Sequence, residues 1–179
     1  FPNSQIDAFE PIPKCYKALV KNTKGLKKIK TYNIAIGDTK KNIKFFINAE
    51  SQSSSALKTT DFRLKIFPEA FAIDEIIVPQ DSLDSLYGDK NIPETCLLKI
   101  DVQGLEEKVL KGSEKILDNI RYILLEASVN SMYEGELPLS KMLSFTESLG
   151  YKLESVVASS RSPITKNYIE FDILFEKVN

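Results

Sequence analysis

The sequence predicts an α/β domain with a mostly parallel sheet whose last strands include an antiparallel pair. Expected strands and helices alternate along most of the chain, and two long strands, 151–157 and 169–176, close it as a hairpin. The near-continuous apolar run 97–102 is typical of a parallel strand that is covered on both faces. With 179 residues, the chain is long enough for one sizeable core, so we assign residues 1–179 to a single domain.

Local signals define the elements of the N-terminal half. The expected strands here are residues 5–10, 29–36 and 42–48. A helix opens near Pro13, because proline suits a first helical turn, and Gly25 ends it. The turn signal Gly37-Asp38 predicts that the second and third strands pair as a hairpin. Residues 51–60 are rich in Ser and Thr and have no hydrophobic period, so we expect a loop.

The C-terminal half continues the alternation of strands and helices. The expected strands are residues 73–78, 95–102, 121–126, 151–157 and 169–176. The expected helical segments are residues 82–86, 105–117 and 139–149. Gly112 and Ser113 should break the middle segment into two helices, and Gly150 should end the last one.

Composition excludes several kinds of chemistry. Histidine is absent, which rules out a histidine general base and every zinc site that needs imidazole. Cys15 and Cys96 match no metal-ligand or redox spacing, so no metal site is expected. Two lone cysteines suit a reducing compartment, and we expect a cytoplasmic protein. A net charge of −1 and the lack of a long apolar run predict neither nucleic-acid nor membrane partners.

Polar residues follow the buried strand 95–102 where ligands usually bind. Asp101 and Gln103 stand at its carboxyl end, and the crevice outside that edge is the common ligand site of open α/β sheets. A carboxylate there can stabilise positive charge or orient a hydroxyl, although an N-cap and turn is the plainer alternative. Lys99 lies on the same side of the strand as Asp101 and can pair with Asp101 or Glu126.

Glu10 closes the first expected strand in a comparable position. A carboxylate there can accept hydrogen bonds from both ribose hydroxyls of an adenosine ligand. The alternative is a glutamate that caps the following helix, which the helix dipole favours.

Three segments resemble signature segments of FkbM-family methyltransferases. Lys-Ile-Asp-Val-Gln-Gly, residues 99–104, is similar to the family's Lys-Ile-Asp-Val-Glu-Gly, with Gln103 in the glutamate position. Residues 8–13 are similar to Phe-Glu-Pro-x-Pro, and residues 33–38 to Asn-x-Ala-Val-Gly-Asp. The resemblance implies a class I, Rossmann-like sheet and S-adenosylmethionine as the cofactor. It also implies methylation of an oxygen on a small molecule or sugar.

The resemblance implies a role for each candidate residue. The cofactor-binding candidates are Glu10 at the ribose with Pro11 beside it, Ala35, Ile36 and Asp38 at the adenine, and Asp101 at the sulfonium. Asp101 also faces the methyl acceptor, and Lys99, Gln103 and Glu126 are the other catalytic candidates. Gln103 keeps hydrogen bonding but lacks the charge of the family's glutamate. The serine-rich segment 53–57 is a candidate border of the acceptor pocket.

One family feature is missing from the sequence. No Gly-x-Gly or Gly-x-Asn-x-Gly loop occurs, and the resemblance places that loop and the central first strand before Phe1. We therefore expect an N-terminally incomplete domain in which residues 1–3 end a helix. We also expect strands 5–10 and 95–102 to be separated by a gap or by a segment from elsewhere. The alternatives are a non-catalytic methyltransferase-like binding or assembly module and, more weakly, a nicotinamide enzyme.

Overall fold

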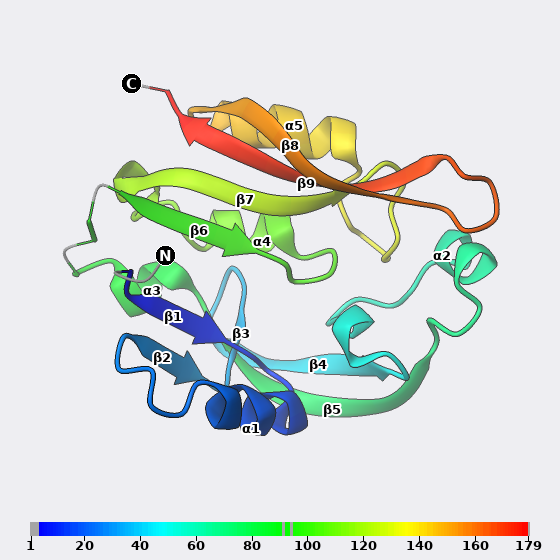
Figure 1. Ribbon diagram of the computed structural model, residues 1–179, viewed down its shortest axis with the longest axis horizontal. Coiled ribbons are helices and arrows are strands. Elements are labelled where there is room, and N and C mark those ends of the chain that lie inside the picture. The colour runs from blue at the N-terminus through cyan, green and yellow to red at the C-terminus, as the bar shows by residue number, and fades with distance from the viewer. Residues whose placement is uncertain (1–3, 91, 94, 179) are drawn as a thin grey trace.

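The computed structural model describes residues 4–90, 92–93 and 95–178. The helix end expected at residues 1–3 therefore lies outside the described residues. The described strands form three sheets of two, three and four strands (Figure 1). The expected α/β class is confirmed, but the described strands form separate sheets with as many antiparallel pairs as parallel ones, so a single, mostly parallel sheet stays a prediction.

The two-stranded sheet is a strand–helix–strand unit. It contains β1 (Ile6–Phe9), α1 (Pro13–Asn22) and β2 (Ile29–Tyr32). The two strands are parallel, and the Phe9 ring stacks on Tyr32 with 4.9 Å between ring centroids. Proline stands in the first turn of α1, as the sequence predicts.

The three-stranded sheet corrects two expectations. Its strands are β3 (Ala35–Ile36), β4 (Lys41–Asn48) and β5 (Ala72–Asp81), in the order β3-β5-β4. The expected strand 29–36 divides between two sheets, because the chain turns at Asn33, whose side-chain amide donates to the Glu10 and Pro11 carbonyls. The expected hairpin is also wrong, since β5 lies between its two strands. Gln80 of β5 holds the intervening turn by donating to the Thr39 carbonyl at 2.8 Å.

The four-stranded sheet carries the C-terminal half. It contains β6 (Cys96–Ile100), β7 (Ile120–Ser128), β8 (Tyr151–Arg161) and β9 (Tyr168–Lys177), in the order β6-β7-β9-β8. β6 and β7 are parallel, whereas β9 is antiparallel to both β7 and β8. The expected antiparallel closing pair is therefore confirmed.

Short helices connect and cover these sheets. They are α2 (Asp61–Ile66), α3 (Leu83–Tyr87), α4 (Glu106–Lys111) and α5 (Leu139–Ser148), with 3-10 turns η1 (Ser51–Ser53) and η2 (Leu117–Asn119). The break at Gly112 is confirmed, although only a 3-10 turn follows it. A β-carbon on Gly112 would lie 2.1 Å from the Gly37 carbonyl oxygen, so only glycine permits this approach. The sequence did not predict α2, which the Thr60 hydroxyl caps.

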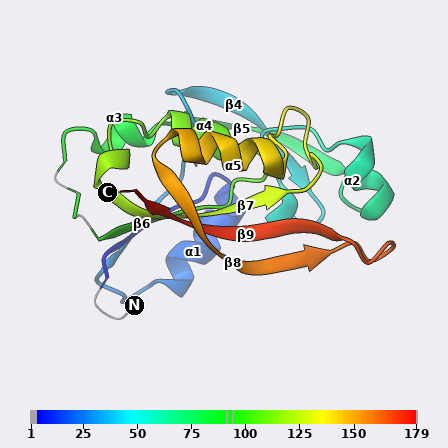
Figure 2. The same ribbon diagram turned by 90° about the horizontal axis from the view of Figure 1, so that it is seen from above.

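The main core lies between the four-stranded sheet and the helices on one of its faces. Figure 2 shows α4 and α5 together on that face. Leu110 of α4, Ile123 of β7 and Phe175 of β9 are completely buried in this core. The core thus fixes β6 and β7 beneath α4, which positions the carboxyl ends of both strands.

The strands β1 and β6 face each other without pairing. Among the described strands, β1 pairs only with β2, and β6 pairs only with β7. Figure 1 shows the two as neighbouring ribbons whose arrowheads point the same way. Ile6 and Leu97 on these strands are 42% and 44% exposed. The expected absence of direct pairing between the first strand and strand 95–102 is confirmed.

Candidate functional site

The pairing register of β6 and β7 places two carboxylates next to each other at the carboxyl ends of these strands. Ile100 pairs with Leu125, so Asp101 and Glu126 follow them side by side. Gln103 links the pair: its Nε2 donates to Asp101 Oδ1 and to Glu126 Oε2, each at 3.1 Å. We call these three residues, Asp101, Gln103 and Glu126, the strand-end cluster. The structure therefore brings together three of the predicted catalytic residues.

The turn that carries Gln103 is held by the side chains of Glu106 and Ser55. Gln103 and Gly104 both adopt left-handed backbone conformations, with φ of 55° and 96°. The buried Glu106 carboxylate accepts the Gly104 N–H at 3.2 Å, and the Ser55 hydroxyl donates to the Gln103 carbonyl at 2.6 Å. Burial raises the pKa of Glu106 to about 7. These contacts hold the turn in its strained conformation beside the strand-end cluster.

Lys99 resolves an alternative left open by the sequence. Its Nζ lies 2.8 Å from Asp101 Oδ2, so it pairs with Asp101 and not with Glu126. Burial raises the pKa of Asp101, but hydrogen bonds from Lys99 and Gln103 outweigh it and lower the pKa below its usual value. Asp101 is therefore ionised at neutral pH.

Glu126 has the opposite electrostatic environment. Burial, followed by the negative charges of Glu170 and Asp101, raises its pKa to about 8. It also lines a cavity of about 140 Å³ between β7, β8 and β9, together with Glu170 and Asp172. Two adjacent carboxyls thus have pKa values shifted in opposite directions, the pattern that separates a charged group from a proton-transfer group.

Tyr133 belongs to this site although the sequence did not point to it. Its hydroxyl lies 2.7 Å from Gln103 Oε1 and 2.8 Å from the Ser53 carbonyl. Burial raises the pKa of the phenol, so it stays protonated and donates. Tyr133 follows β7 by five residues, and the rule that ligands bind beyond carboxyl strand ends would have identified this loop.

Glu10 lies directly after β1, as predicted, and its side chain is half-buried. Its Oε1 accepts the Ile12 N–H at 2.7 Å at the start of α1, the contact that the capping alternative expects. Burial raises the pKa of Glu10, and this hydrogen bond partly opposes the rise. Oε2 has no partner among the described residues, which leaves one carboxylate oxygen for a ligand.

The remaining predicted cofactor residues are apart from the strand-end cluster. Ala35 and Ile36 are buried in the core at 5% and 8% exposure. Asp38 accepts the Thr39 hydroxyl at 3.1 Å and lies 3.7 Å from Lys41. Within the described part of the chain, no hydrogen bond or ion pair joins Asp38 to Glu10 or Asp101. Pro11 lies beside Glu10, and its carbonyl accepts the Asn33 amide at 3.1 Å.

Neither a metal-binding cluster nor a membrane-spanning helix occurs in residues 4–90, 92–93 and 95–178. No group of three or more Cys, Asp or Glu side chains there is placed to hold a metal ion. No helix there is both long enough and apolar enough to cross a membrane.

The strand-end cluster thus lies at the carboxyl ends of adjacent parallel strands, where open α/β sheets bind their ligands. A sequence model described as the methyltransferase FkbM domain matches residues 4–153, and the chain belongs to this family. The 2-O-methyltransferase NoeI of Sinorhizobium fredii is 27% identical over 148 residues, which cover 79% of this chain. The match spans 61% of that relative, less than two thirds of its length.

A solved structure has a similar fold. The methyltransferase FkbM from Methylobacillus flagellatus KT superposes with a TM-score of 0.50 at 14% sequence identity. The superposition covers 94% of this chain and 36% of the other. The likeness therefore extends along nearly all of this α/β chain.

Proposed function

We propose that the protein is an S-adenosylmethionine-dependent methyltransferase that methylates a hydroxyl oxygen of a small molecule or saccharide. Membership of the FkbM family and the relative named as a 2-O-methyltransferase support this proposal. The observation that carries it is the strand-end cluster, in which Gln103 joins an ionised Asp101 to Glu126, whose surroundings raise its pKa to about 8.

The proposed sheet is Rossmann-like, with one more parallel strand between β1 and β6 contributed from outside the described residues. Its strand order would be β2-β1, the added strand, and then β6-β7-β9-β8. The open, parallel edges of β1 and β6 support this arrangement (Figure 1). An added strand would pair backbone groups that cost roughly 1–3 kcal/mol each when buried without partners.

The residues present fit an adenosine-bearing cofactor at one point. Glu10 has a carboxylate oxygen without a protein partner at the end of β1, where ribose hydroxyls can donate to it. Pro11 would border the ribose. Ala35, Ile36 and Asp38 remain predicted adenine contacts, and Asp38 is the most exposed of these three.

When bound, S-adenosylmethionine supplies a methyl group on a positively charged sulfur. The Asp101 carboxylate would stabilise that charge, and Lys99 and Gln103 would hold the carboxylate in place. Glu126, once ionised, would take the proton that the acceptor hydroxyl gives up on methylation, while the methyl group would leave the sulfur and S-adenosylhomocysteine would be released. Alignment of the two reactants would supply much of the rate.

The test is Asp101→Asn, which keeps the shape of the side chain and removes its charge. Transfer of a labelled methyl group to hydroxylated acceptors should fall by at least ~10-fold, since a positioned group of this kind contributes about 10²–10⁴-fold. Binding of S-adenosylhomocysteine, measured by calorimetry, distinguishes loss of chemistry from loss of the cofactor. Equal rates would reduce Asp101 to a helix cap, and cofactor binding without any transfer would favour the non-catalytic alternative.

A further inference from the structure

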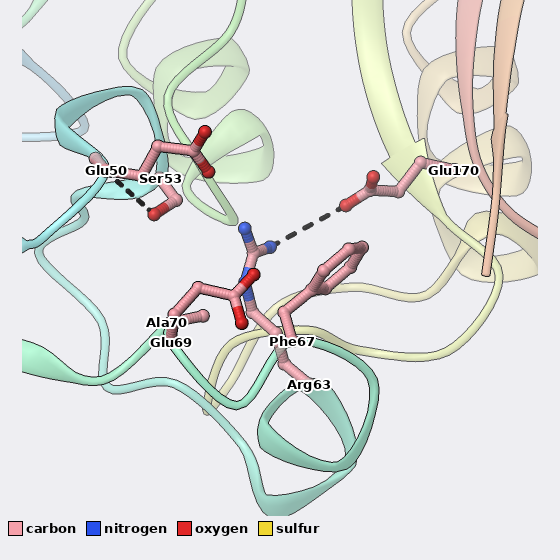
Figure 3. A pocket seen from close by; sticks show the side chains of 7 residues that line it. All are labelled: Glu50, Ser53, Arg63, Phe67, Glu69, Ala70 and Glu170. Atoms are coloured by element: carbon pink, nitrogen blue, oxygen red, sulfur yellow. Dashed lines mark hydrogen bonds and ion pairs between the residues drawn. The ribbon is translucent and has the colours of Figure 1, made fainter. Parts of the chain in front are cut away.

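A buried arginine faces a cavity beside the strand-end cluster. Arg63 of α2 is 8% exposed, yet its Nε and Nη1 have no hydrogen-bond partner among the described residues. The cavity has a volume of about 110 Å³. Figure 3 shows the guanidinium among side chains from three segments of the chain. They include Glu50, Ser53, Phe67, Glu69 and Glu170. We call this space the Arg63 cavity.

Aromatic rings and one distant carboxylate surround the Arg63 guanidinium, but they leave N–H groups of it without hydrogen bonds. The guanidinium carbon lies 4.7 Å from the centre of the Tyr133 ring and 5.7 Å from that of Phe67. Its ion pair with Glu170 has Nη1 and Oε1 3.7 Å apart, too far for a hydrogen bond. Buried donors are nearly always paired in folded proteins. This incompletely paired guanidinium lines the cavity, which indicates a partner that enters there and meets its open side.

The Arg63 cavity adjoins the proposed site of methyl transfer. Glu170 lines both this cavity and the one that contains Glu126. Tyr133, which packs against Arg63, also contacts Gln103 through its hydroxyl. A molecule that spans the two cavities would therefore present one end to Arg63 and the other to Glu126.

The charges of the cavity select the chemistry of its ligand. Three carboxylates, those of Glu50, Glu69 and Glu170, surround a single guanidinium. The excess of negative charge would repel an anion, and the positive charge of Arg63 would repel a cation. A neutral hydroxyl can donate to a carboxylate and accept from the guanidinium, so hydroxyl groups satisfy both kinds of partner.

We propose that the Arg63 cavity is the acceptor subsite, which binds a neutral, hydroxyl-rich part of a saccharide while a neighbouring hydroxyl reaches Glu126. This assignment rests on the proposed function for its role in methyl transfer. The binding itself depends only on residues of this chain, so it can be tested without the cofactor.

The experiment compares three sugars that differ in one charged group. D-glucose, D-glucuronate and D-glucosamine are titrated into the protein and followed by saturation-transfer NMR. D-glucose should bind best. Arg63→Gln and Arg63→Lys should each weaken it about ten-fold or more, because the lysine keeps the charge but not the fork of donors. Arg121→Gln, which also breaks an ion pair but at the opposite end of β7, is the matched control and should leave binding unchanged.

A second variant keeps the test decisive if the Arg63 variants do not fold. Glu69→Gln leaves the Arg63–Glu170 pair intact and should raise D-glucuronate binding relative to D-glucose. Unchanged D-glucose binding in folded Arg63→Gln, stronger D-glucuronate than D-glucose binding by the wild type, or no D-glucose binding would each overturn the subsite. If S-adenosylhomocysteine binds while no sugar does, only the subsite fails. Arg63-dependent sugar binding without cofactor binding would instead count against the proposed function.

Discussion

Replacing Glu126 with glutamine should separate the hydrogen bonding of this carboxyl group from its ionisation. Glu126→Gln keeps the size of the side chain and an oxygen that accepts from Gln103, but it cannot ionise. The variant therefore removes the buried charge whose pKa rises to about 8 through burial and the neighbouring Glu170 and Asp101. Its effect on stability should depend strongly on pH.

The size of the effect follows from the shift in pKa. Moving a carboxyl pKa from its usual 4.5 to about 8 disfavours the charged form by roughly 5 kcal/mol, at about 1.4 kcal/mol per pH unit. Partial exposure of Glu126 to solvent reduces this to roughly 2–3 kcal/mol. Between the usual pKa of 4.5 and the raised pKa of about 8, Glu126 keeps its proton in the folded protein but has lost it in the unfolded chain. The wild type therefore loses stability as the pH rises through this window.

The assay is urea unfolding followed by circular dichroism at several pH values. Glu126→Gln should match the wild type below about pH 4.5 and exceed it by roughly 2–3 kcal/mol above about pH 8. Glu154→Gln, which removes a carboxylate from the exposed strand β8, is the control and should not reproduce this gain at high pH. If the Glu126 variant shows no gain at high pH, the carboxyl is not held neutral by its surroundings. Methyl transfer by the same variant should fall about 10²-fold or more, because no proton acceptor replaces Glu126.

Two further substitutions test the cofactor site and the fold. Glu10→Ala should weaken S-adenosylhomocysteine binding by roughly 1.5–3 kcal/mol for each charge-assisted hydrogen bond lost, measured by calorimetry. Unchanged affinity would remove Glu10 from the site. Gly112→Ala should destabilise the protein by roughly 1–3 kcal/mol in urea, because its β-carbon would lie 2.1 Å from the Gly37 carbonyl oxygen. An unchanged midpoint would mean that the two backbones separate at no cost.

Local sequence patterns predicted most of the elements. Apolar runs located β6 and β7, glycines and prolines located the ends of α1, α4 and α5, and the motif around Asp101 pointed to the site. These features depend on residues near each other in the chain, so the sequence contains their signals directly. Glu126 was also predicted, because it ends the apolar strand expected at residues 121–126.

Only the tertiary structure decided which segments meet. The Gly37-Asp38 turn indicated a hairpin, but β5 inserts between β3 and β4, because a ten-residue strand from later in the chain offers more pairing. Arg63 and Tyr133 carry no local signal, since their roles depend on contacts between α2, the loop after β7 and the turn after β6. The pKa values of Asp101 and Glu126 likewise diverge only in the fold. Lys99 pairs with one carboxyl, and burial beside Glu170 keeps a proton on the other.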